Sequence, residues 1–197
     1  SLDSPTVFAD LLDNGKGGAF TIAPEMDQPR HLQLYIPDTN VLLTRWMADT
    51  GSAEIVDLMP HPEARLPSSG GARSLIRRLT VTSGTVTFTM RCAPRFDYAR
   101  EIPQVTGVDG GVRFSGRDLT LSLFASVPLD QERGCASARF TLKRGESVWY
   151  VLGEAAMPRP DDAAVTAQID ATTHAWRAWL SGSTYKGRWR EQVLRSA

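Results

Sequence analysis

The strongest constraint on the fold is a period-two alternation of apolar and polar residues in short runs from residue 19 to residue 153. In residues 85–92 the apolar side chains fall on one face of an extended chain and the polar ones on the other, as in a half-buried strand. Gaps such as 82–85 and 108–111 are rich in Gly, Asp, Ser and Thr and are too short for parallel crossovers. The sequence therefore predicts a mainly β fold of antiparallel sheets packed face to face. The predicted strands are 19–23, 31–36, 41–47, 53–58, 74–82, 86–92, 111–115, 119–127, 138–143 and 148–152.

Helical patterns are expected only at the two ends of the chain. Near the start, Pro5 suits a first turn, and Val7, Phe8, Leu11 and Leu12 recur at helical spacing, so a short N-terminal helix is predicted. Residues 14–18 are rich in glycine and would end it.

The β pattern stops at residues 158–162, where two prolines are followed by two aspartates that suit a helix N-terminus. Val165, Ile169, Thr172, Trp176 and Trp179 then recur at spacings of four and three, which predicts a helix with a tryptophan stripe. Residues 189–197 begin another amphipathic pattern. We therefore expect a β-sandwich domain over 1–157, a linker helix within 158–187, and the first residues of a truncated helical domain at 188–197.

Composition argues against several partners. The 22 Lys and Arg balance the 22 Asp and Glu, so nothing electrostatic favours nucleic acid or an acidic membrane surface. No apolar run approaches the roughly 18 residues of a transmembrane helix. The two cysteines, Cys92 and Cys135, are interpreted as buried free thiols in preference to a disulfide, which favours a cytoplasmic location.

Motifs for catalysis or metal binding are few. His31, His61 and His174 are far apart, and neither HExxH nor CxxC occurs, so no metal and no cofactor are expected. Arg77 and Arg78 would point to opposite faces of one strand, with a nearby carboxylate as partner.

Glycoside hydrolysis requires a pair of carboxylates, and the candidates in this sequence are Asp3, Asp38, Asp57 and Asp97. We interpret Asp38 as a turn residue, Asp57 as a solvent-facing strand residue, and Asp97 as the partner of Arg95 in a structural clamp. No catalytic residue is predicted in this chain.

Five stretches resemble one family. They are the DSPTVFADLL element at 3–12, YIPDTNVL at 35–42, DLMP at 57–60, PRFDYA at 94–99 and the segment from Trp176 to RWREQVLRSA at 188–197. Together they resemble the trehalase-like N-terminal domain of bacterial family 15 glycoside hydrolases. Ala99 stands where glycine is common in that family.

The resemblance implies a β-supersandwich and a linker helix followed by an (α/α)6 barrel that carries two catalytic glutamates. On this reading the chain is a non-catalytic accessory domain that braces the barrel of an inverting glucoamylase or trehalase. Asp3, Arg95, Asp97, Tyr98, Trp176 and Trp179 are the residues that we expect at the domain interface or at the rim of the active site. The expected partners are the barrel itself and, through the longer protein, an α-glucan or trehalose.

An alternative interpretation is a carbohydrate-binding or protein-interaction sandwich. Trp46, Trp149 and Tyr150 are its candidate platform, although Trp149 and Tyr150 lie in an apolar strand that favours a core position. Exposed apolar surface would also allow a homodimer.

Overall fold

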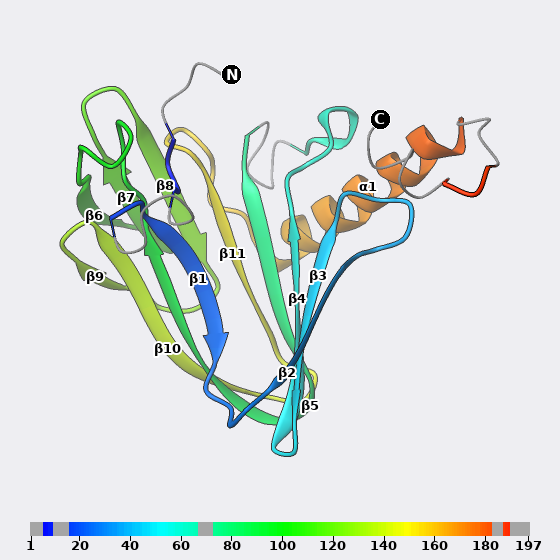
Figure 1. Cartoon of the computed structure of the whole chain (residues 1–197). Coiled ribbons are helices and arrows are strands. Elements are labelled where there is room, and N and C mark those ends of the chain that lie inside the picture. The colour runs from blue at the N-terminus through cyan, green and yellow to red at the C-terminus, as the bar shows by residue number, and fades with distance from the viewer. Residues whose placement is uncertain (1–5, 10–15, 67–72, 183–186, 190–197) are drawn as a thin grey trace.

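The computed structural model describes residues 6–9, 16–66, 73–182 and 187–189. Within these ranges, eleven antiparallel strands form one sheet that is folded into two layers, and a single α-helix lies against the outer face of one layer (Figure 1). The predicted antiparallel sandwich with a C-terminal helix is confirmed. The strands are β1 (Ala19–Pro24), β2 (Arg30–Tyr35), β3 (Leu42–Ala48), β4 (Gly51–Leu58), β5 (Leu75–Ala93), β6 (Gln104–Val108), β7 (Gly111–Ser115), β8 (Thr120–Ala125), β9 (Asp130–Glu132), β10 (Cys135–Lys143) and β11 (Ser147–Glu154).

The two layers share strand β5. Its first half pairs with β4 and β11 in the layer ordered β2-β3-β4-β5-β11-β8-β7-β6. Its second half pairs with β1 and β10, and β9 extends that layer beyond β10. The layers therefore diverge from the bend in β5 and open toward the opposite end of the molecule (Figure 1).

The bend in β5 corrects the prediction of two strands separated by a turn at residues 82–85. Val81 and Val86 are both buried between the layers, so the inward face changes from odd to even residue numbers across this segment. The pairing with β4 shifts by one residue at the same point, which is a β-bulge. Gly84 has a φ of 70°, and a Cβ there would lie 2.2 Å from the Thr50 carbonyl oxygen, so only glycine fits. The strand bends here and continues.

Two apolar cores hold the elements together. The larger lies between the layers and includes the fully buried Leu79, Phe88, Met90, Phe114 and Leu123. The smaller lies between the outer face of the β4-β5-β11 layer and α1, and its buried members are Val41, Leu58, Ile76, Phe124, Trp149, Val151, Met157 and Val165.

The helix α1 (Asp162–Ser181) begins where the aspartates predicted it. Asp161 caps the helix by accepting a 2.7 Å hydrogen bond from the Ala164 backbone amide. The Trp149 indole donates a hydrogen bond to the Asp162 carboxylate, which fixes the first turn on the sheet. A short 3-10 helix, η1 (Pro62–Ala64), follows β4. Of the second predicted C-terminal helix, the residues from 190 onward lie outside the described ranges.

The predicted N-terminal helix is wrong where the structure describes it. Residues 6–9 are not helical. The Val7 carbonyl accepts a hydrogen bond from Arg95 N (3.0 Å), and Ala9 N donates to the Gly17 carbonyl (2.7 Å). Val7 and Phe8 pack against the larger core, so long-range pairing overrides their helical spacing. Leu11 and Leu12 lie outside the described residues.

Candidate functional site

The structure separates the predicted interface residues into two groups. Arg95, Asp97 and Tyr98 follow the end of β5, on the side of the molecule that carries β6, β7 and β8, whereas α1 lies on the other side with Trp176 and Trp179 (Figure 1). Asp3 lies outside the described residues. The group after β5 forms a tight loop at residues 96–101, called the 96–101 loop below.

The 96–101 loop holds three consecutive non-glycine residues in the left-handed region. The φ angles are 48° at Asp97, 54° at Tyr98 and 68° at Ala99. Each such residue costs on the order of 1–3 kcal/mol and persists only where the surroundings enforce it. Here the ends are closed by two backbone hydrogen bonds between Phe96 and Glu101, of 2.9 and 3.1 Å. The loop therefore presents Tyr98, which is 54% exposed, in a fixed position.

The expected Arg95–Asp97 pair is not formed. Arg95 Nη1 donates instead to the carbonyl oxygens of Pro94 and Gly134, each at 2.9 Å, which ties the loop to the turn before β10. Asp97 Oδ1 lies 3.9 Å from Arg100 Nη1. The left-handed backbone turns the Asp97 side chain away from the direction that strand spacing predicts.

A hollow of about 650 Å³ with a mixed charged and apolar lining lies beside this loop. The Glu101 carboxylate accepts a 2.9 Å hydrogen bond from the Arg117 backbone amide, which joins the loop to the β7–β8 turn. Sequence spacing does not reveal Glu101 and the β7–β8 turn as partners. They lie 16 residues apart, and the pairing of the strands between them brings them together. The charged lining comes from Asp97, Arg100, Glu101, Arg117 and Asp118.

A second polar feature, the cross-layer clamp of Arg77, Asp57 and Phe20, joins the two layers. Arg77 makes two hydrogen bonds to the Asp57 carboxylate, of 2.9 and 3.1 Å, and donates a third, of 2.5 Å, to the Phe20 carbonyl oxygen. Its guanidinium also lies 4.7 Å from the centroid of the Phe20 ring. The two charged side chains are only 14% and 16% exposed. Asp57 is thus mostly buried, which corrects its interpretation as solvent-facing.

Arg78 points away from the clamp, as predicted for adjacent residues on a strand. Its guanidinium donates a 2.7 Å hydrogen bond to Thr166 of α1 on the outer face of the layer. The two arginines therefore act separately, one between the layers and one under the helix.

Two of the three candidate platform aromatics belong to the cores. Trp149 is 5% exposed and Tyr150 is fully buried, so neither presents a face to a sugar. The Tyr150 hydroxyl has no hydrogen-bond partner among the described residues, and burial raises its pKa. Trp46 is partly buried and stacks on His31, with ring centroids 6.4 Å apart.

The two cysteines are free and buried, as predicted. Cys92 is opposite Ala136 across the β5–β10 pair, so Cys135 projects from the other face of the sheet. Burial raises the pKa of both thiols. No three His, Cys, Asp or Glu side chains converge as metal ligands among the described residues. Across the same ranges, none of the helices has the length and apolarity that spanning a bilayer requires.

The sandwich itself, which ends with β11 before α1 begins, is the part of the chain that comparison with protein families matches. The family described as "Trehalase-like, N-terminal" matches residues 1–150. The chain belongs to this family. The residues that match the trehalase-like N-terminal family include strands of both layers up to the first half of β11, the 96–101 loop and the cross-layer clamp.

Curated relatives are much longer than this domain. The trehalase of Thermoplasma acidophilum is 29% identical over all of this chain, which corresponds to 34% of that protein. The trehalase of Mycolicibacterium smegmatis is 28% identical over 99% of the chain and 32% of that protein. Trehalase 1 of Sulfolobus acidocaldarius is 34% identical over 66% of the chain and 21% of that protein. The chain thus spans about a third of the length of the first two relatives.

Proposed function

We propose that this trehalase-like N-terminal domain is the non-catalytic accessory domain of a family 15 glycoside hydrolase and that it braces the catalytic barrel. The observation that carries the proposal is the family match over residues 1–150, combined with relatives about three times as long that are named trehalases. In such an enzyme a general acid protonates the leaving oxygen of an α-glucosidic bond while a general base activates water.

Two of the carboxylates named above, Asp57 and Glu101, support an accessory role because they make structural contacts. Asp57 is paired with Arg77 in the cross-layer clamp, and the Glu101 carboxylate accepts a hydrogen bond from the Arg117 backbone amide. A general acid or base of a glycosidase must be available to the substrate instead.

The 96–101 loop is the part of the domain that we assign to the rim of the active site. Backbone strain at three adjacent residues is typical of functional sites, and here it places Asp97 in the lining of the hollow and leaves Tyr98 exposed on the same loop. Hydroxyl-rich sugars suit such a mixture of carboxylate, guanidinium and aromatic groups. A substrate such as trehalose or a maltooligosaccharide would meet this rim from the barrel side.

A cytoplasmic location is part of the proposal, since two buried free thiols are typical of a reducing compartment.

The test compares the longer protein with this chain. The longer protein should release glucose from trehalose or maltooligosaccharides, and the purified chain should release none. Replacing Tyr98 with Ala in the longer protein should raise KM, with a smaller effect on kcat, because a rim residue contacts bound substrate without joining the reaction. Turnover by the purified chain that disappears when one of its own residues is substituted would refute the proposal.

A further inference from the structure

The corner formed by η1 and the middle of α1 is held by buried polar contacts. Gln168 and Thr172 are both fully buried on α1. The Gln168 side chain accepts from Leu66 N and donates to the Ala64 carbonyl oxygen, each at 2.7 Å. Thr172 Oγ1 accepts from Gln168 Nε2 at 3.1 Å and from His61 N at 3.4 Å. The segment after β4 is therefore fastened to the helix at several points.

Aromatic packing continues this corner toward the end of the helix. The His61 ring meets Trp176 edge-on at 4.6 Å, and Trp176 meets Trp179 edge-on at 5.8 Å. Such contacts fix the orientation of Trp179 without covering it. Its ring remains 45% exposed, and Met59, two residues before His61, is 65% exposed.

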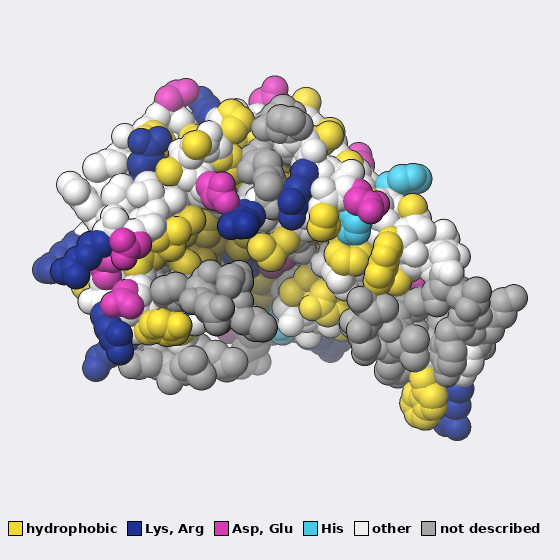
Figure 2. All heavy atoms as spheres, turned by 90° about the horizontal axis from the view of Figure 1, so that it is seen from above, with side chains coloured by type: hydrophobic (Ala, Val, Ile, Leu, Met, Phe, Trp, Pro, Cys, Tyr) yellow, Lys and Arg dark blue, Asp and Glu magenta, His cyan; other side chains and the backbone are white. Residues whose placement is uncertain are grey.

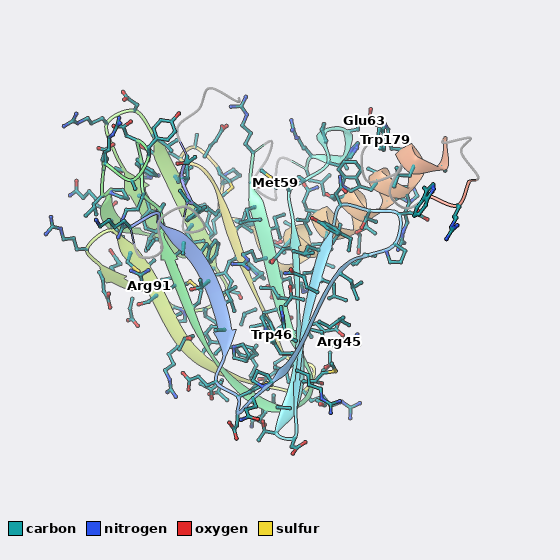
Figure 3. The ribbon with its side chains drawn as sticks, viewed as in Figure 1. Arg45, Trp46, Met59, Glu63, Arg91 and Trp179 are labelled. Carbon is teal, nitrogen blue, oxygen red and sulfur yellow. The ribbon has the colours of Figure 1, made fainter. Side chains whose placement is uncertain are left out.

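Exposed Trp and Met side chains on a rigid frame are characteristic of interface centres. Met59, Glu63 and Trp179 all lie at the open end of the molecule, with Glu63 and Trp179 beside the end of α1 (Figure 3). η1, which contains Glu63, contacts α1 directly. The same end, seen from above, shows exposed hydrophobic side chains with basic and acidic side chains among them (Figure 2). Exposed apolar side chains mixed with charges of both signs fit a protein surface better than a membrane or a nucleic acid.

We infer that Met59 and Trp179 form the docking surface for the region that follows α1 in the longer protein, an inference that rests on the proposed function. Chain connectivity indicates that the region after α1 is the part of the longer protein that binds this surface. Trp179 stands three residues before the helix cap Gly182, so a following region is tethered beside this corner at high effective concentration. The relatives are about three times as long as this chain, which supplies a region large enough to cover it.

The experiment measures opening of this interface in the longer protein by native-state proteolysis. The protease cuts the connection between this domain and the region after it. When undocking and redocking are faster than cleavage, the cleavage rate is proportional to the population of the undocked state. Trp179→Ala should raise the cleavage rate about tenfold and Met59→Ser about threefold. His174→Ala is the matched control, since His174 is an exposed residue of the same helix on a different face, and its rate should stay within twofold of the wild type.

The same variants in the 197-residue chain show whether internal packing has been lost. Their urea unfolding midpoints should stay close to that of the unsubstituted chain. Cleavage rates for Trp179→Ala and Met59→Ser that both remain within twofold of the wild type would overturn the docking inference. The docking inference would also be overturned if the loss of stability of the same variants in the 197-residue chain fully accounted for their faster cleavage. Because the readout needs no substrate, an absence of trehalose or maltooligosaccharide hydrolysis by the longer protein would refute the proposed function alone.

Discussion

Replacing Asp57 with Ala should destabilise the domain by about 3 kcal/mol, because it removes the counterion of an Arg77 side chain that remains between the layers. The magnitude follows from two charge-assisted hydrogen bonds of 2.9 and 3.1 Å, each contributing about 1.5 kcal/mol net. Removing one partner of a buried ion pair costs roughly 3–5 kcal/mol, and exposures of 14% and 16% favour the lower end.

Urea unfolding followed by tryptophan fluorescence measures this loss. With a slope of about 2 kcal/mol per molar for a domain of this size, the midpoint should fall by about 1.5 M. The double variant Arg77→Met with Asp57→Leu should recover much of the loss, because two apolar side chains leave no buried charge unpaired.

The matched control is the Arg139–Glu25 pair, which has the same two-bond geometry at 2.8 and 2.7 Å on the solvent-exposed face of the other layer. Its side chains are 69% and 37% exposed, so Glu25→Ala should leave the urea midpoint almost unchanged. Both carboxylates accept two hydrogen bonds from one arginine, so the substitutions differ mainly in the burial of the pair that they break. If Asp57→Ala shifts the midpoint no more than Glu25→Ala does, the clamp does not hold the layers together and the reasoning fails.

Three other predictions use the same unfolding assay or simple chemistry. Ala99→Gly should raise stability by about 1 kcal/mol because φ is 68° there, whereas Ala167→Gly within α1 should lower it by about 1 kcal/mol; effects of equal sign would contradict this. Tyr150→Phe should raise stability by about 1 kcal/mol by removing a buried hydroxyl that no other group in the described ranges satisfies. Since burial raises the Tyr150 pKa, stability should fall above about pH 10, where only the unfolded chain ionises, and Tyr150→Phe should reduce that fall. Cys92 and Cys135 should resist a thiol reagent in the native protein and both react in denaturant; a native disulfide by mass would refute this.

Much of the sandwich follows from the period-two alternation, because a strand with one buried face records its orientation in the sequence. The exceptions have physical causes. β9 is three exposed polar residues, Asp130–Glu132, and has no apolar face to detect. β6 contains Gly107 and has no fully buried residue, so its alternation is weak. The helical spacing of Val7 and Phe8 was misleading because their partners are distant strands.

The candidate site was less predictable than the fold. Spacing placed Arg95 and Asp97 on one face of an extended chain, but the left-handed turn that begins at Asp97 separates them. The resemblance pointed to the DLMP stretch that contains Asp57 and Met59, yet the role of each depends on partners elsewhere in the chain. Arg77 reaches Asp57 from the neighbouring strand, and Thr172 fixes the His61 segment after Met59 from a helix more than one hundred residues later.

A strand common to both layers limits how this domain can change length during evolution. Adding or removing one residue in either half of β5 would exchange the inward and outward side chains of that half. The bulge beside Gly84 already corrects one such offset, and Gly84 lies too close to Thr50 to accept a side chain. Length differences among homologous domains should therefore accumulate in the connections between strands, while Leu75–Ala93 keeps a constant number of residues.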